Sequence, residues 1–490
     1  MTRPTDRAHD RAHDRAHDRT YDLVGIGVGP FNLGLAALAD PLDDVDAVFL
    51  DRREGFSWHP GMMLEGATIQ VPFLADLVTM ADPTSPYSFL AFLKDTGRLY
   101  PFYIRESFYP LRAEYDEYCR WAADRLTTLR WGRDVTAMDR DEETGDLVVT
   151  ARLSAGPDGT ARTETYRARH VVLGVGTTPQ LPGPLAALAA EAARHPGAGP
   201  VVHSADYLPH RDALAASGAV TVVGSGQSAA EVYRDLLEDA APDAHRVDWV
   251  TRSPRFFPME YTKLTLEMTS PEYTDHYRAL PTELREILGR EQRALYKGIS
   301  GDLVDDIYDT LYRKSALGRE VPTTLLSDTE VVAARYEPDD GADGSTDRAG
   351  EYVLTLRHGQ LGTTAEHRTR AVVAATGYGA GVPGFVAPGL VDLDELGRVD
   401  VARDYTAGAG GRLHVGGTEA HTHGVTAPDL GFAAWRNSVI LAQVTGREPY
   451  AIERRIAFQT FGLPGGRPDG ERSTPWSPPE PAAAEREVAR

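Results

Sequence analysis

Two short apolar strands that each lead directly into a glycine-rich turn constrain the fold of this 490-residue chain more than any other feature. The first covers residues 21–30, Tyr-Asp-Leu-Val-Gly-Ile-Gly-Val-Gly-Pro, and the second covers residues 220–229, Val-Thr-Val-Val-Gly-Ser-Gly-Gln-Ser-Ala. A strand, a glycine turn and a helix form the dinucleotide-binding unit, whose helix N-terminus offers free N–H groups to a pyrophosphate. Because strands alternate with helical patterns elsewhere too, we expect an α/β fold with two Rossmann-like domains.

The first turn keeps most of the dinucleotide-binding pattern. Gly25 permits the tight turn, Gly27 lets the backbone approach a pyrophosphate, and Gly29 precedes Pro30, which takes the place of the usual third glycine. The next apolar strand ends in Asp51, which is placed to accept hydrogen bonds from ribose hydroxyls. The alternative is that Asp51 is a strand-end carboxylate with no ligand.

The second turn is predicted to bind NADPH through Gly224, Ser225, Gly226, Gln227 and Ser228. After the following strand, Arg252 stands where a site specific for NADH would place an acid. A guanidinium pairs well with the additional ribose phosphate of NADPH, so NADPH is preferred over NADH. The alternative for Arg252 is a solvated surface residue.

Two further apolar strands, at 170–176 and 371–378, resemble the crossings between the domains of two-dinucleotide flavoproteins. We therefore expect a discontinuous FAD-binding domain with an NADPH-binding domain inserted into it. The expected boundaries are 21–200 and 371–462 for the FAD domain and 201–370 for the NADPH domain. The polar ends, 1–20 and 463–490, are predicted to be disordered tails.

Composition excludes several classes of protein. The formal net charge of −21 argues against a nucleic-acid or anionic-membrane partner. Cys119 is the only cysteine, so a disulfide, a dithiol redox pair and a cysteine-rich zinc site are excluded, and no metal site is indicated. Neither a membrane span nor a signal peptide is recognisable, so we expect a cytoplasmic protein.

A protein with two dinucleotide sites and no pair of redox cysteines can catalyse few kinds of reaction. Hydride from NADPH would reduce the flavin, and O₂ is the natural acceptor of the flavin's electrons. The protein would then be a monooxygenase or an oxidase that releases peroxide.

Five ordered motifs carry a resemblance to a known family. They lie at 27–34 (Gly-Val-Gly-Pro-Phe-Asn-Leu-Gly), 56–62 (Phe-Ser-Trp-His-Pro-Gly-Met), 69–76 (Ile-Gln-Val-Pro-Phe-Leu-Ala-Asp), 224–231 (Gly-Ser-Gly-Gln-Ser-Ala-Ala-Glu) and 375–378 (Ala-Thr-Gly-Tyr). From about residue 21 to 461 the chain resembles the lysine/ornithine N-monooxygenases of hydroxamate siderophore biosynthesis. The resemblance implies a smaller, partly helical substrate region near 253–320 and a homo-oligomer, with tetramers common in the family.

The resemblance also implies the sites. Residues 51–59 would line the FAD, Gln70 would lie beside the flavin ring, and Val135 would contact the adenosine half. Trp58 and His59 could equally form an aromatic pair packed beneath the flavin. Further expected cofactor contacts are Thr376, Gly377, Pro428, Asp429 and Leu430.

Three departures from the amino-acid enzymes indicate a different substrate. The positions that hold the amino-acid head group in the family, a Lys, an Asn and a Ser, align with Ala75, Leu266 and Gly431. An unpaired substrate carboxylate would lose about 1.5–3 kcal/mol. The pattern resembles the diamine N-monooxygenases, which act on putrescine or cadaverine, and does not decide between the two.

The other end of a diamine requires a partner for its ammonium. Asp429, Glu260 and Glu267 are the candidates. Two alternatives remain: a lysine or ornithine enzyme that holds the carboxylate with Arg105 or Lys263, and an NADPH oxidase or flavin redox sensor.

The resemblance implies hydroxylation through a flavin hydroperoxide, which only a neutral amine can attack. The site must therefore lower the pKa of the reacting amine by removing it from water. Gln70 is the expected catalytic side chain near the flavin. Family members place an Asn near the oxygenated flavin, and the matching stretch, 294–300, contains none; Lys297 is the candidate replacement, with a solvated lysine as the alternative.

Overall fold

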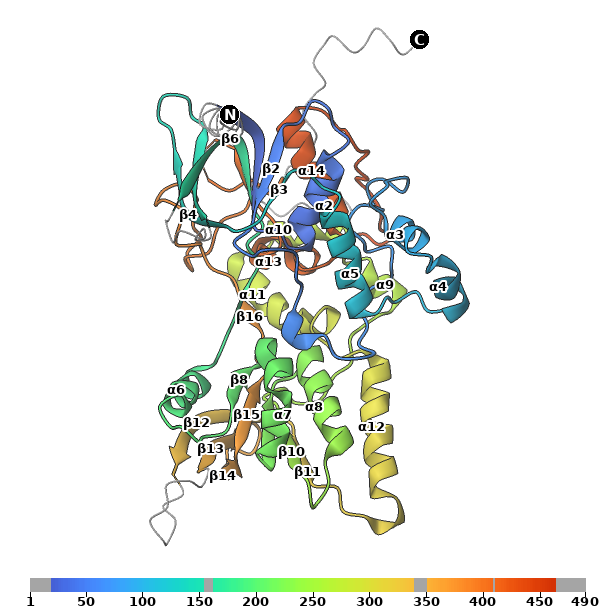
Figure 1. Ribbon diagram of the computed structural model, residues 1–490, viewed down its shortest axis with the longest axis vertical. Coiled ribbons are helices and arrows are strands. Elements are labelled where there is room, and N and C mark those ends of the chain that lie inside the picture. Colours follow the sequence, from blue (N-terminus) through green and yellow to red (C-terminus); the bar gives the residue numbers. More distant parts are fainter. Residues whose placement is uncertain (1–18, 154–161, 339–349, 409, 464–490) are drawn as a thin grey trace, which may run out of the picture.

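The computed structural model describes residues 19–153, 162–338, 350–408 and 410–463. The chain forms two halves, which lie one above the other in Figure 1; the first is built around a mixed sheet and the second around a parallel sheet. The tails predicted at 1–20 and 463–490 fall almost entirely outside the described residues. Within the described residues, no helix is long and apolar enough to cross a membrane.

The first half contains a seven-stranded sheet with the order β3-β2-β1-β6-β5-β4, in which β17 also pairs with β6. β1, β2, β3, β6 and β17 run parallel, whereas β4, β5 and β6 pair antiparallel. Its strands are β1 (Thr20–Ile26), β2 (Ala47–Leu50), β3 (Leu129–Arg130), β4 (Arg133–Arg140), β5 (Leu147–Leu153), β6 (Thr163–Leu173) and β17 (Leu413–Val415). Helices α2 (Pro30–Ala39), α5 (Arg112–Ala123) and α14 (Ala433–Thr445) share the largest apolar core on this sheet.

The second half contains a five-stranded parallel sheet with the order β11-β10-β9-β15-β8. Its strands are β8 (Val201–His203), β9 (Ala219–Val223), β10 (Arg246–Val250), β11 (Thr323–Leu326) and β15 (Ala371–Ala374). Its helices are α6 (Gly183–Ala192), α7 (Tyr207–Ala216), α8 (Gln227–Asp239) and α12 (Gly301–Ser315). A separate antiparallel sheet joins β12 (Thr329–Glu337), β13 (Glu351–His358) and β14 (Thr364–Thr369).

Two short paired strands carry the chain between the halves. β7 (Thr178–Pro179) leads into the second half and pairs antiparallel with β16 (Tyr378–Gly379), which leads back. β15 pairs with β8 and β9, and α6 packs against β12, so both elements lie with the second sheet. The expected boundaries at residues 200 and 371 therefore assign α6 and β15 to the wrong half, because apolar strands of either sheet look alike in sequence.

Short helices fill the space between the halves and one side of the first half (Figure 1). They are α3 (Phe89–Asp95), α4 (Leu99–Arg105), α9 (Lys263–Leu266), α10 (Pro271–Ala279), α11 (Thr282–Glu291) and α13 (Ala420–His423). Single 3₁₀ turns occur at Pro60–Met62, Ser204–Asp206, Gln292–Leu295, Ala316–Gly318 and Gly424–Thr426. Tyr273 and Tyr277 of α10 pack on Val425, so this part of the predicted substrate region contacts the first half.

Candidate active site

The first glycine turn has the geometry of a pyrophosphate cradle. Gly27 has a φ of +87°, and a Cβ atom there would lie 2.6 Å from the carbonyl oxygen of Gly174. Gly29 precedes α2 and has open space where its Cβ would stand. Because the first turn of a helix has unpaired N–H groups, the open side of this turn suits an anion. The residues present therefore fit the dinucleotide expected here.

Gly25 serves packing in this turn. A Cβ atom there would lie 2.1 Å from the ring of Phe49 on the neighbouring strand. The tight packing of β1 on β2 thus requires a glycine at this position.

Asp51 binds the glycine turn itself. Its Oδ2 accepts from the N–H of Val28 at 2.7 Å, and its Oδ1 accepts from the N–H of Arg53 at 2.8 Å. The guanidinium of Arg53 donates to both oxygens and also to the carbonyl of Val28. Burial raises the pKa of Asp51, but these hydrogen bonds outweigh it and hold the pKa below its usual value. A ribose hydroxyl could bind Asp51 only by replacing part of the Arg53 contact.

The second glycine turn leads from β9 into α8. A Cβ atom on Gly224 would lie 2.3 Å from the carbonyl oxygen of Ala375, and one on Gly226 would lie 3.0 Å from that of Lys297. Gly226 begins α8 without a side-chain cap, so the helix N-terminus is available to a phosphate. Ser225 and Ser228 are partly buried in the same turn.

Gln70 lies where three segments meet. Its Nε2 donates to Oε1 of Gln227 at 3.2 Å and to the carbonyl oxygen of Gly298 at 3.3 Å. Tyr261 lies beside Gln70, and the pKa of its hydroxyl is raised to about 12, mainly by burial. The residue expected beside the flavin is thus in direct contact with the second glycine turn.

The rings of His59 and Trp58 pack against each other and against two tyrosine rings. The ring of His59 lies 5.2 Å from Trp58 and 5.9 Å from Tyr378, between centroids, and Trp58 packs on Tyr115. His59 is exposed, yet partial removal from water and the nearby Arg112 lower its pKa to about 4. It is therefore neutral at physiological pH, and the backbone at His59 has a φ of +47°.

Two of the three substrate positions come together. A Cβ atom built on Gly431 would lie 3.5 Å from Cβ of Ala75 and 3.0 Å from Oδ1 of Asp429. Oδ1 of Asp429 accepts from the N–H of Phe432 at 2.8 Å. Burial raises the pKa of Asp429, against the effect of the N–H groups of Phe432 and Gly431. Ala75 and Gly431 therefore lie together beside one carboxylate.

The remaining substrate candidates lie elsewhere. Leu266 ends α9 with half of its side chain exposed and is outside the 4 Å surroundings of Gly431. Glu267 accepts hydrogen bonds from the backbone N–H groups of Phe458 and Gln459, at 2.9 and 3.0 Å. Nε2 of Gln459 also donates to Oε2 of Glu267, so Glu267 holds residues 458–459, whereas Glu260 is exposed.

Several predicted cofactor contacts have structural partners. Oγ1 of Thr376 donates to the carbonyl oxygen of Gln180 at 2.5 Å. The carbonyl oxygen of Gly377 accepts from the ring of His203 at 3.0 Å. Thr376 and Gly377 therefore fix the crossing between the halves. Val135 lies on β4 of the first sheet and packs, partly buried, against an apolar cluster of that sheet.

Three further predicted residues differ in their exposure. Leu430 packs partly buried on the core of the first half, and Pro428 is exposed. Lys297 is exposed, with its Nζ 5.3 Å from the ring centre of Tyr296 and its pKa lowered by partial burial and by Arg293. Their roles toward cofactor or catalysis remain predictions.

The family model for L-lysine 6-monooxygenase/L-ornithine 5-monooxygenase matches residues 19–380. The chain belongs to this family. It is therefore an N-monooxygenase, and the resemblance expected from the five motifs is confirmed.

Within the family, some of the most similar proteins act on diamines. A putrescine N-hydroxylase of Shewanella oneidensis is 44% identical over 90% of this chain and 84% of its own length. The structure of a cadaverine monooxygenase from the desferrioxamine pathway of Erwinia amylovora, bound to FAD, matches with a TM-score of 0.84 and 43% identity, covering 91% of this chain and 99% of that one. An ornithine N-hydroxylase of Kutzneria, solved with reduced FAD, NADP⁺ and L-ornithine, matches with a TM-score of 0.74 and 28% identity over 87% and 99% of the two chains. The cofactors of these relatives agree with the expected FAD and NADPH.

A buried ion pair supports the loop that carries Asp429. Nε of Arg436 lies 3.3 Å from Oε1 of Glu419, and both side chains are almost completely buried. Nη2 of Arg436 donates to the carbonyl oxygens of Thr426 and Ala427, at 3.2 and 2.8 Å. The start of α14 thereby fixes the chain just before residues 428–431.

Sequence reasoning missed several residues of this site. Nδ2 of Asn32 donates to the carbonyl oxygen of Gly27 at 2.8 Å and braces the first glycine turn. Its position directly after Gly-Val-Gly-Pro-Phe was the available signal. Glu231 follows Gln227 by one helical turn and contacts it, which the helical spacing could have indicated. Arg112 and Arg436 had no local signal, because their partners are distant in sequence.

Arg252 is exposed and forms no ion pair with any described residue, two residues after β10. We expect Arg252→Ala to raise KM for NADPH by about tenfold or more, because a charge-assisted hydrogen bond contributes about 1.5–3 kcal/mol. KM for NADH should stay unchanged, since NADH lacks the additional phosphate. Steady-state kinetics with both nucleotides test this, and an equal rise for both would show that Arg252 does not contact that phosphate.

Proposed function

We propose that the protein uses FAD, NADPH and O₂ to hydroxylate one primary amine of an aliphatic diamine, putrescine or cadaverine. The observation that carries the proposal is the cluster of Ala75, Gly431 and Asp429. The side chains within 4 Å of the Cβ position of Gly431 are those of Ala75 and Asp429, so a substrate carboxylate there would face a carboxylate of the protein. A distal ammonium would instead find an anionic partner beside an apolar surface.

The two glycine turns support the assignment of the cofactors. The turn at 27–30 would hold the pyrophosphate of FAD, and the turn at 224–228, with Arg252, would hold NADPH. When bound, the reduced flavin supplies the electrons that activate O₂. The balanced reaction is R–NH₂ + NADPH + H⁺ + O₂ → R–NHOH + NADP⁺ + H₂O.

The side chains of the chain bind and orient the substrate. Oδ1 of Asp429 accepts from the N–H of Phe432, and a carboxylate offers about four acceptor positions, so an ammonium can be accommodated. The apolar surface of Ala75 suits a methylene chain. Gln70 is held by Gln227 and Gly298, and the reacting amine would be desolvated and deprotonated beside it.

The proposal is tested by measuring N-hydroxylated product, together with NADPH consumption, for putrescine, cadaverine, L-lysine and L-ornithine. We expect a kcat/KM for the better diamine at least about tenfold above that of either amino acid, because a carboxylate without a partner loses about 1.5–3 kcal/mol. Efficient product from lysine or ornithine would contradict the diamine assignment. Peroxide release equal to NADPH consumption with every amine would indicate an oxidase.

The same assay with Asp429→Asn distinguishes a role in binding the diamine from a role in the hydroxylation step. The loss of one charge should raise KM for the diamine with little change in kcat, and should leave FAD content as in wild type. A KM for the diamine equal to that of wild type would exclude Asp429 as the anchor.

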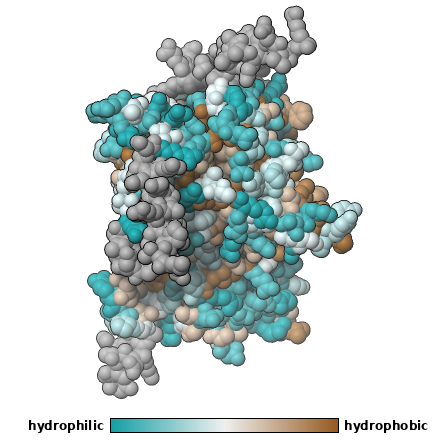
Figure 2. All heavy atoms as spheres, turned by 45° about the horizontal axis from the view of Figure 1, so that its top comes forward, coloured by the Kyte–Doolittle hydropathy of each residue, from teal (hydrophilic) through white to brown (hydrophobic). Residues whose placement is uncertain are grey.

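Exposed apolar side chains support a homo-oligomer, with a tetramer as the proposed form. Tyr100, Tyr103 and Ile104 on α4, and Phe108 after it, are each more than half exposed. α4 projects at the right of Figure 1, and hydrophobic residues appear at the right edge of the molecule in Figure 2. Apolar patches of this kind commonly mark protein interfaces. We further propose a cytoplasmic role in hydroxamate siderophore biosynthesis, which requires N-hydroxylated amines.

A further inference from the structure

A buried ion pair joins the two halves of the molecule. Arg112 is the first residue of α5, and Glu231 lies in the first turns of α8, 119 residues away. Nη2 of Arg112 lies 2.6 Å from Oε1 of Glu231, Nη1 lies 2.9 Å from Oε2, and only 12% and 6% of the two side chains are exposed. A two-pronged contact between guanidinium and carboxylate fixes orientation as well as distance.

The backbone on both sides is fixed at the same place. Nη1 of Arg112 also donates to the carbonyl oxygen of Met62 at 2.6 Å. A Cβ atom on the adjacent Gly61 would lie 1.8 Å from the carbonyl oxygen of Ala205 in the second half. The segment that follows His59 is therefore clamped between Arg112 and the second half.

The carboxylate of Glu231 sets the orientation of the Gln227 amide. Nε2 of Gln227 donates to Oε1 of Glu231 at 2.9 Å. Because a carboxylate only accepts hydrogen bonds, the amide must present its nitrogen to Glu231 and its oxygen to the opposite side. There the oxygen accepts from the N–H of Ser300 at 2.9 Å and from Nε2 of Gln70 at 3.2 Å.

We infer that Glu231 is a positioning residue that orients Gln70 through Gln227 and, through Arg112, holds the nicotinamide half against the flavin half. The inference rests on the proposed function in placing Gln70 beside the flavin. When Gln70 and the two halves are no longer held in this arrangement, NADPH and O₂ react without the amine: NADPH + H⁺ + O₂ → NADP⁺ + H₂O₂. Glu231 therefore raises the fraction of consumed NADPH that yields hydroxylated amine.

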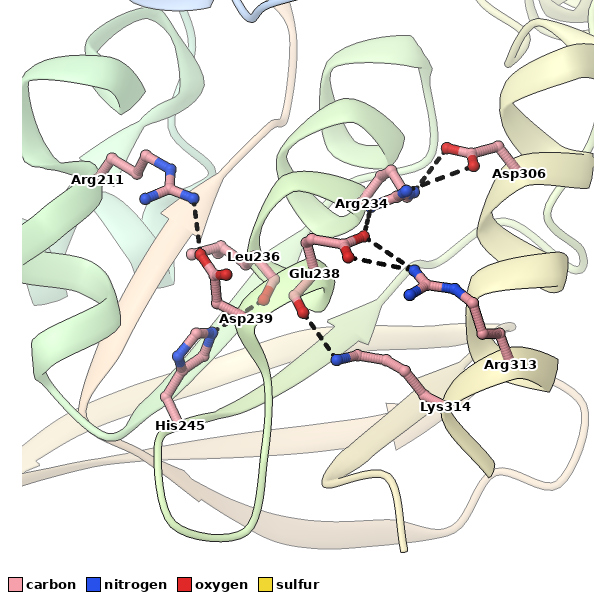
Figure 3. Close-up of polar contacts among 9 residues, drawn as sticks. All are labelled: Arg211, Arg234, Leu236, Glu238, Asp239, His245, Asp306, Arg313 and Lys314. Carbon is pink, nitrogen blue, oxygen red and sulfur yellow. Dashed lines mark hydrogen bonds and ion pairs between the residues drawn. The ribbon is translucent and has the colours of Figure 1, made fainter. Parts of the chain in front are cut away.

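The same helix offers a matched control. Glu238 of α8 forms ion pairs with Arg234 and with Arg313 of α12 (Figure 3). Its side chain is exposed, and it lies eleven residues after Gln227, near the other end of the helix. Glu238→Gln removes the same charge from the same helix. It leaves the contacts of Gln227 and Arg112 in place.

The test compares Glu231→Gln, Glu238→Gln and wild type by two measurements. The first is the ratio of N-hydroxylated product to NADPH consumed, with the best amine substrate. The second is hydrogen exchange of the backbone amides of Met62 and Ser300 in the FAD-loaded protein without substrate. A glutamine at position 231 can donate to Gln227, so it no longer dictates the orientation of that amide, and it leaves Arg112 without its charged partner.

We expect Glu231→Gln to lower the product ratio by threefold or more and to speed exchange of the two amides by about tenfold, because a charge-assisted contact is lost. Glu238→Gln should match wild type in both. A Glu231→Gln protein that matches wild type, or equal effects in the two variants, would overturn the inference. If wild type hydroxylates no amine, the proposed function fails, while the exchange measurement still decides the role of Glu231.

A second variant covers the case in which Glu231→Gln does not fold. Gln227→Met removes the amide and keeps the ion pair of Glu231 with Arg112. It should lower the product ratio as Glu231→Gln does, with exchange at Met62 unchanged. An unchanged product ratio in Gln227→Met would overturn the link from Glu231 to Gln70.

Discussion

Gly27→Ala is expected to produce a folded protein that retains almost no FAD. The alanine would need a φ near +87°, which costs an L-residue about 1–2 kcal/mol, and its Cβ would meet the carbonyl oxygen of Gly174 at 2.6 Å. Relief of that contact must move the turn away from the position that fits a pyrophosphate. We expect the affinity for FAD to fall by about 100-fold or more, equivalent to about 3 kcal/mol. The ratio of flavin to protein absorbance after gel filtration measures this, with circular dichroism as a check on folding.

The control for this substitution is Gly183→Ala. Gly183 lies at the start of α6, has no atom within 4 Å of its Cβ position and is not in the left-handed region. It should keep the full FAD content. If Gly27→Ala also keeps it, the first turn does not bind the pyrophosphate.

Arg436→Leu is expected to destabilise the protein by about 3–5 kcal/mol, because it leaves the buried carboxylate of Glu419 without its charged partner. The carbonyl oxygens of Thr426 and Ala427 lose their donor at the same time. The loop that carries Asp429 should loosen, so KM for the diamine should rise as well. Chemical unfolding followed by protein fluorescence, together with substrate kinetics, measures both effects.

Two further variants show whether the buried charge is the cause. Arg436→Leu combined with Glu419→Leu removes both charges and should recover part of the lost stability. Arg19→Ala breaks an exposed ion pair with Asp46 and should change stability by less than about 1 kcal/mol. Equal losses for Arg436→Leu and Arg19→Ala would show that burial of the pair is unimportant.

The parts of the site that could be predicted from sequence are those with local signals. Gly27 and Gly224 follow strands at the expected spacing, and the structure places both in turns that leave no room for a side chain. Ala75 and Gly431 were identified only through resemblance, since no local pattern joins residues so far apart in the chain. Their meeting beside Asp429 depends on how α14 packs on the first sheet.

Other features had no sequence signal. β15 has the same apolar composition as the strands of the first sheet, so only its hydrogen bonding to β8 and β9 shows where it belongs. Arg53 donates to both oxygens of Asp51, because an arginine two residues later can fold back onto the carboxylate, and the role of Asp51 toward a ribose stays a prediction. Arg112 and Glu231 lie in different halves and are 119 residues apart in sequence. The pattern of apolar residues within a helix does not show which residues meet between the halves.

The paired crossings β7 and β16 have a consequence for the order in which the protein is made. The second sheet is built from a continuous stretch of chain, whereas the first sheet is complete only when β17 pairs with β6. On the ribosome, residues of β6 emerge long before those of β17, and the entire second half is synthesised between them. The second half can therefore reach its native topology while the part of β6 that pairs with β17 is still unpaired. Such an unpaired strand edge can pair with the wrong strand, so this part of the nascent chain is the one most exposed to misfolding.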